Sequence, residues 1–198
     1  MDYYTELNRI NDKYYNKIKK AYSKYIKNFD SIPDLTQNVY IIPDNKCIDD
    51  YEDLAVGKNR GRCDADTGNI YIRESAFCEH LLIHEFIHRL SRNCRQGNWT
   101  NGLGCFYLVP FYGINELITE WIAFSITNIK EANNRQQNLF FLIDNFKCEH
   151  RIRFALLFRF YFIGDIQKAT KVIPKKSFNK LIYINNYILL GTDYDKLI

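Results

Sequence analysis

Apolar side chains recur every three or four residues in several parts of the chain, which is the spacing of an amphipathic helix. The first part covers residues 2–28, where lysines lie between the apolar positions Leu7, Ile10, Tyr14, Ile18, Ala21 and Tyr25. The second runs from about residue 75 to 92, with Ser75 as the expected N-cap. A third begins at Asn115 and continues to about Ile129. The pattern predicts a helix in each part.

The last third of the chain is also expected to be helical. Residues 132–146 and 149–162 are strongly apolar on one side, and they are predicted to supply the core residues Phe140, Phe141, Phe146, Phe154, Leu157 and Phe158. A final helix, about residues 177–190, is followed by Gly191, which suits a left-handed cap.

Two short segments have the pattern of strands. Residues 38–42 form one of them, closed by Pro43, and residues 68–74 alternate after a turn and form the other. The segment between them, 44–68, is rich in turn residues, and the segment 96–113 is expected to be an irregular loop. Short strands combined with several helices predict an α+β fold with a short mixed sheet.

Length and composition limit the number of domains. With 198 residues, of which 46% are hydrophobic, the chain suffices for one packed core but hardly for two. We therefore expect one domain over residues 1–198. Its parts would be an N-terminal helix (1–28), the sheet with the second helix (29–113) and a mostly helical remainder (114–198).

Targeting features and cysteines indicate the compartment. Residues 1–9 lack the basic start and apolar core of a secretory signal, and the longest uncharged stretch, 96–115, contains glycines and a proline that disfavour a membrane span. We expect a cytoplasmic protein, although a processed, secreted form would look the same. The six cysteines include no C-x-x-C pair and are expected to be reduced; if bridges form, Cys94 with Cys105 is the expected pair.

The sequence His84-Glu85-Phe86-Ile87-His88 has the clearest chemistry in the chain. Residues four apart share one face of a helix, so both imidazoles can bind one Zn²⁺, and the glutamate beside them can reach a metal-bound water. A catalytic zinc takes three protein ligands and keeps one position open. Glu116 and Glu120 share a face of the next predicted helix. Either carboxylate could complete the site, since their spacing alone does not choose between them.

The motif and the later sequence Asn-Glu-x-x-Thr-Glu at 115–120 together resemble the gluzincins, the thermolysin-like zinc metallopeptidases. The resemblance covers two helices. Carried over by position, it implies that Glu116 is the third zinc ligand and that Glu120 orients His84. It also implies a zincin-like fold and a peptide or protein substrate. The peptide bond would be hydrolysed by a zinc-activated water, with Glu85 as general base.

Other residues are candidates for parts of such a site. Gluzincins commonly use a tyrosine between the two helices to stabilise the oxyanion, which makes Tyr107 and Tyr112 candidates. His150 is expected to be an ordinary surface histidine; the alternatives are an oxyanion donor and, less expected, a third ligand in place of Glu116. In zincins, an edge strand at the position of residues 68–74 pairs with the extended substrate; the alternative here is an interior strand.

His80 lies four residues before His84, which suggests a site of three histidines. However, His80 and His88 would lie about 12 Å apart along a helix at 1.5 Å per residue, so one ion cannot bind both. We expect His80 to be a surface or packed histidine.

Charge is the main argument for a competing function. The net charge is +4, and residues 147–180 hold nine Lys or Arg against two acids. Such a stretch is either the solvated surface of helices or a site for nucleic acid, and no nucleic-acid fold motif accompanies it. One alternative to a peptidase is therefore a basic nucleic-acid-binding protein. Another, which does not depend on charge, is a zinc-containing regulatory or binding protein that keeps the fold but has little catalysis. Nucleic acid is the less expected partner, and the sequence leaves the oligomeric state open.

Overall fold

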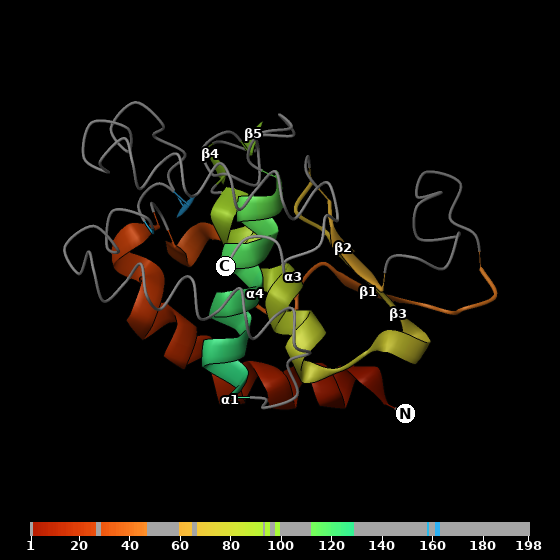
Figure 1. Cartoon of the computed structure of the whole chain (residues 1–198). Helices are drawn as coiled ribbons and strands as arrows, with labels where there is room; N and C mark the ends of the chain where they lie inside the picture. Colours follow the sequence, from red (N-terminus) through yellow and green to blue (C-terminus); the bar gives the residue numbers. More distant parts are fainter. Residues whose placement is uncertain are drawn as a thin grey trace.

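The computed structural model describes residues 2–26, 29–46, 60–64, 67–92, 94–95, 98–99 and 112–128, together with Phe158, Tyr161 and Phe162. In these residues a small three-stranded mixed sheet lies beside several helices, which confirms the α+β class (Figure 1). The helices predicted at 132–146 and 177–190 lie outside the described residues.

Helix α1 spans Tyr3–Tyr22. The side chain of Asp2 caps its start by accepting a hydrogen bond from the backbone N–H of Tyr4 at 3.1 Å. The buried side of α1 consists of Leu7, Ile10, Tyr14, Ile18 and Tyr22. The chain then tightens into a 3₁₀ turn at Ser23–Tyr25 instead of continuing as an α-helix to residue 28, a common ending for a helix.

The sheet consists of β1 (Val39–Ile42), β2 (Gly61–Cys63) and β3 (Ile70–Arg73), in the order β1-β3-β2. Strand β3 is parallel to β1 and antiparallel to β2. Of the two possibilities for the 68–74 segment, the interior strand is therefore correct, and β1 and β2 are the edges of the described sheet.

A tight turn joins β2 to β3. Asp64 accepts hydrogen bonds from the backbone N–H and the hydroxyl of Thr67, both at 2.7 Å. Gly68 follows with a φ of 71°, a left-handed conformation that favours glycine. The hairpin brings Ile70 and Ile72 of β3 to the buried face of the sheet.

Helix α3 spans Glu79–Arg92 and begins four residues later than predicted. The expected N-cap at Ser75 is wrong, because Ser75 lies in a separate 3₁₀ turn, Glu74–Ala76, and its hydroxyl donates to Asp44 at 2.9 Å. The hydroxyl of Ser75 is thus bound by Asp44, which is distant in the sequence, and does not cap the helix as the local spacing predicted. The first helical hydrogen bond near this end runs from Leu82 to the carbonyl of Cys78.

A buried arginine connects α3 to the loops that precede the parallel strands. The guanidinium of Arg89 donates to the carbonyl oxygens of Gly68 at 2.8 Å, Asp34 at 2.7 Å and Asn38 at 2.9 Å, and to that of Pro33 at 3.3 Å. Burial lowers the pKa of Arg89 to about 10. This side chain holds the start of β1 and the start of β3 against the same helix.

Helix α4 spans Tyr112–Thr127, three residues longer at its start than predicted, and ends before Asn128, whose φ is 55°. The segment 96–113, expected to be an irregular loop, contains strand β5 (Asn98–Trp99), which pairs with β4 (Cys94–Arg95) directly before that segment. Figure 1 shows α3 between the sheet and α4, with α1 along the lower side of the view. Phe158, predicted to lie in the core, is buried there together with Tyr161 and Phe162.

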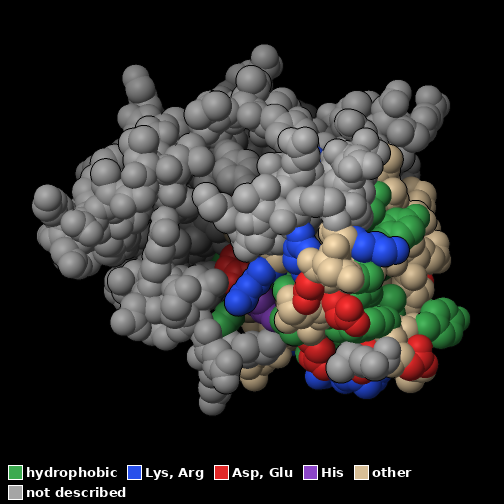
Figure 2. All heavy atoms as spheres, turned by 90° about the vertical axis from the view of Figure 1, so that its right-hand side faces the viewer, with side chains coloured by type: hydrophobic (Ala, Val, Ile, Leu, Met, Phe, Trp, Pro, Cys, Tyr) green, Lys and Arg blue, Asp and Glu red, His purple; other side chains and the backbone are tan. Residues whose placement is uncertain are grey.

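The outer surface of the described part is mixed in character. Figure 2 shows the side of the sheet, where apolar side chains lie among basic and acidic ones. Among the helices described, none is both long enough and apolar enough to cross a membrane.

Candidate metal centre

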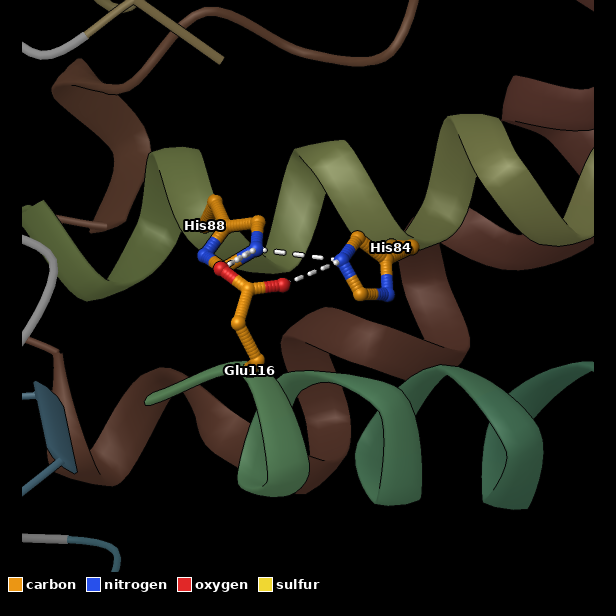
Figure 3. Close-up of side chains that lie close together, drawn as sticks. All are labelled: His84, His88 and Glu116. Carbon is orange, nitrogen blue, oxygen red and sulfur yellow. Dashed lines mark hydrogen bonds and ion pairs between the residues drawn. The ribbon is translucent and has the colours of Figure 1, made fainter. Parts of the chain in front are cut away.

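Two neighbouring helices carry the predicted site. His84 and His88 lie one turn apart on α3, and Glu116 reaches toward them from α4 (Figure 3). Polar contacts farther along the helices pair His80 with Glu120 and His88 with Asn115. The two helices are therefore antiparallel, and one row of polar side chains follows the line between them.

The ligand atoms of His84, His88 and Glu116 all lie within 4.8 Å of one another. The two Nε2 atoms are 3.1 Å apart, and the carboxylate oxygens of Glu116 lie 3.4 Å from Nε2 of His84 and 3.3 Å from Nε2 of His88. A tetrahedral zinc with bonds of 2.0–2.1 Å separates its ligand atoms by about 3.3–3.4 Å. The three contacts are close to this separation, with each oxygen of Glu116 facing a different imidazole, so the three groups can approach one such ion.

The hydrogen bond of His84 determines which of its nitrogens carries a proton. Its Nδ1 lies 2.7 Å from an oxygen of Glu120. A carboxylate only accepts, so Nδ1–H is the donor. This leaves the lone pair of a neutral His84 on Nε2, the atom that faces the candidate metal position.

His88 is oriented in the same way by different groups. Its Nδ1 lies 3.3 Å from the hydroxyl of Thr119. That hydroxyl donates to the backbone carbonyl of Asn115 at 2.8 Å, so it can only accept from His88. Thr119 also contacts the hydroxyl of Tyr161, which is fully buried. Nδ1–H is again the donor, and the lone pair of His88 is on Nε2.

A buried amide beside His88 supports this assignment. The side-chain nitrogen of Asn115 lies 3.3 Å from Nδ1 of His88, whereas its Oδ1 is buried without a hydrogen-bond partner in the described structure. Rotation of the amide by 180° places the oxygen at Nδ1–H and removes the unsatisfied acceptor. The amide oxygen therefore has a donor when His88 has the tautomer that leaves Nε2 available to a metal ion.

The centre thus presents two imidazole lone pairs and one carboxylate to a common point. Such an arrangement is repulsive unless a cation lies there. Burial disfavours a charged His84, but its hydrogen bonds to Glu116 and Glu120 and the charge of Glu85 raise its pKa to about 10. Despite burial, both histidines lower the pKa of Glu116, and His80 and His84 lower that of Glu120 to about 2. A proton on His84 is thus the cation that a metal ion would replace.

Glu85 lies beside this point and not among the three ligands. Its side chain is buried, and burial raises its pKa, although the two zinc-motif histidines and the backbone N–H of Cys63 act in the opposite direction. A Cβ on Gly61 would lie 3.1 Å from Oε1 of Glu85. The absence of a side chain at Gly61 therefore gives Glu85 its place under the edge strand β2.

The predicted residues fall into two groups. The structure brings together His84, His88, Glu116, Glu120 and Glu85. Glu120 contacts Nδ1 of His84 rather than the common point, which favours Glu116 as the ligand; the roles themselves stay predictions.

The other candidates are not placed by the structure. Tyr107 and His150 lie outside the described residues, and Tyr112 is the first residue of α4, with a side chain that is not described. Of the basic stretch 147–180, only Phe158, Tyr161 and Phe162 are described.

Sequence reasoning missed several residues near the centre. His80, expected to be a surface or packed residue, does pack against Phe124, but its contact with Glu120 was not predicted. Its position four residues before His84 was the available indication, but its partner lies on another helix. Tyr161 and Gly61 gave no indication, because their contacts to Thr119 and Glu85 join segments that are distant in the sequence.

Comparisons with protein-family models, with curated proteins and with solved structures found no match to this chain.

Proposed function

We propose that this protein is a zinc-dependent metallopeptidase with a zincin-like arrangement of sheet and helices. One observation carries the proposal: the ligand atoms of His84, His88 and Glu116 lie within 4.8 Å of one another, with the lone pairs of both imidazoles directed to a common point. Two imidazoles and a carboxylate form an established ligand set for catalytic zinc, and the adjacent Glu85 supplies a proton acceptor.

The sheet supports a peptide substrate. Backbone hydrogen bonds pair Arg60 with Arg73 and Asp64 with Asn69, at the two ends of β2. Hydrogen-bonded and non-hydrogen-bonded residues alternate along an antiparallel strand, so the main-chain N–H and C=O of Arg62 point toward β3. The main-chain groups of Gly61 and Cys63 point away from β3. This outer side of β2 lies next to Glu85. An extended peptide added along it would have its backbone beside the general base.

The residues then have distinct tasks. Zinc bound by His84, His88 and Glu116 would polarise the scissile carbonyl and acidify water. Glu85 takes a proton from the attacking water on its carboxylate and delivers it to the leaving amine nitrogen. A raised pKa suits both steps, because the carboxyl must gain and lose the proton near neutral pH. Glu120, Thr119 and Asn115 hold the two imidazoles in the required tautomer.

The substitution Glu85→Gln tests the proposal. It keeps the shape of the side chain and removes its basicity, so zinc should remain at one ion per chain while cleavage of unfolded casein or a peptide library falls at least about 100-fold. Zinc is measured by elemental mass spectrometry and cleavage by peptide mass spectrometry. Glu74→Gln is the matched control, because Glu74 is exposed and binds Tyr3 at 2.7 Å, away from the site.

Three results would overturn the proposal. Purified protein that takes up no zinc excludes the metal centre. Protein that binds zinc but cleaves equally well with Gln at position 85 excludes this mechanism. Stoichiometric zinc without any cleavage by the wild type would favour the regulatory or binding protein instead.

A further inference from the structure

Glu120 uses both oxygens of its carboxylate to bind imidazoles of α3. Oε2 lies 2.7 Å from Nδ1 of His84, and Oε1 lies 3.0 Å from Nε2 of His80. His80 and His84 are one helical turn apart, so their rings lie on the same side of α3. A single carboxylate thus spans two consecutive turns of the helix that carries the metal site.

His80 is itself held in place. Its Nδ1 lies 3.2 Å from the hydroxyl of Thr127, which also lies 2.9 Å from the carbonyl of Ala123. The carboxylate of Glu120 only accepts, so Nε2–H of His80 is the donor to it. The ring of Phe124 packs edge-on against the imidazole, with ring centroids 6.4 Å apart. The side chains of His80 and Glu120 are 21% and 19% exposed, so water competes little for these bonds.

We propose that His80 is a positioning residue of the metal centre, which acts through Glu120 on the orientation of His84. The carboxylate of a glutamate rotates easily about its last bond when only one oxygen is bound. Binding of the second oxygen by His80 fixes the plane of the carboxylate and thereby the direction of its bond to His84. The inference rests on the metal centre of the proposed function and assigns a role to a residue outside the zinc motif.

Two substitutions separate the hydrogen bond to Glu120 from the rest of the imidazole. In His80→Gln the amide nitrogen can occupy the place of Nε2 and keep the bond to Glu120. In His80→Asn it can occupy only the place of Nδ1 and keep the bond to Thr127. Both variants lose the ring that contacts Phe124, so they are matched in packing.

The measurement is the zinc dissociation constant of the full chain, obtained by competition with a chromophoric chelator. His80→Asn should weaken zinc binding about tenfold, and His80→Gln should stay within about threefold of the wild type. The visible absorption of the Co²⁺-substituted proteins should change with His80→Asn and not with His80→Gln. Thermal unfolding of the metal-free variants shows whether both are folded.

Each outcome supports or overturns the proposed role of His80. Equal affinities of His80→Asn and the wild type overturn the inference, as does an equal loss in both variants, which would assign the effect to ring packing. If His80→Asn does not fold, a tenfold or greater loss in His80→Gln overturns it as well. Wild-type protein that binds no zinc overturns the proposed function and this inference together, whereas the preceding results overturn the inference alone.

Discussion

Nε2 of His84 and Nε2 of His88 lie 3.1 Å apart, while the Nδ1 atom of each ring is held as a donor by groups behind it. Two neutral imidazoles in this state would direct their lone pairs at each other. The arrangement is stable only with a cation between them, either a proton on one ring or a metal ion that also takes up Glu116.

This contact predicts proton release on zinc binding. In the metal-free protein the pKa of His84 is raised to about 10, so the ring carries an extra proton at pH 7.5 that zinc must displace. About one proton should be released per zinc, and the apparent affinity should fall about tenfold for each unit of pH below that pKa. Calorimetric titration in buffers of different ionisation enthalpy measures the proton count; a count near zero would contradict the assignment.

The two glutamates of α4 should differ in their effect on zinc binding. Glu116→Gln removes a ligand and should weaken binding by about 1,000-fold or more, whereas Glu120→Gln should weaken it by about 10- to 100-fold. Chelator competition measures both, with Glu74→Gln as control. The reverse order would show that the two residues exchange roles.

Gly61→Ala should lower cleavage without affecting zinc. The added methyl would lie 3.1 Å from Oε1 and 3.3 Å from Cγ of Glu85, so this side chain must move. We expect about a tenfold loss in kcat, since a small displacement of a general base is costly. Zinc content should stay at one per chain because Glu85 is not a ligand, and loss of zinc in this variant would contradict that view.

Glu79 should make the contact between α1 and α3 sensitive to acid. Burial acts to raise its pKa, but hydrogen bonds from Tyr14, Arg9 and Lys13 lower it to about 2. The lowered pKa stabilises the folded state above about pH 4.5, and this contribution is lost as the pH falls toward 2. Glu79→Gln should therefore cost about 1–2 kcal/mol at pH 7 and almost nothing at pH 2.

Urea unfolding of the metal-free protein at a series of pH values measures this difference. The control is Glu74→Gln, which replaces an exposed carboxylate bound only at the surface to Tyr3. A cost that does not change with pH would show that the ionisation of Glu79 does not contribute.

Arg89→Met should destabilise the fold strongly. The apolar side chain fills much of the volume, but it leaves the carbonyls of Gly68, Pro33, Asp34 and Asn38 without their buried donor. We expect a loss of about 3 kcal/mol or more in the free energy of unfolding. The exposed Arg60 gives the control Arg60→Met, and similar urea midpoints for the two variants would contradict the prediction.

Several features of the fold could be predicted from local spacing. The helical periodicity identified α1, α3 and α4 and placed His84 and His88 on one face, because these relations depend only on the geometry of a single helix. The boundaries were less certain: Ser75 has the side chain of an N-cap, but its hydroxyl bonds to Asp44 in another segment. Local spacing contains no information about a hydrogen-bond partner in another segment.

By itself, the sequence determined which side chains share a helix face and which chemistry they can perform. The tertiary structure decided that β3 is interior, that Glu116 meets both imidazoles and that Glu120 lies behind His84, next to His80. The reason is physical: a carboxylate at position 116 or 120 can reach α3 from the same face of its helix. Only the antiparallel packing of α3 and α4 sets which one lies opposite the gap between the two histidines.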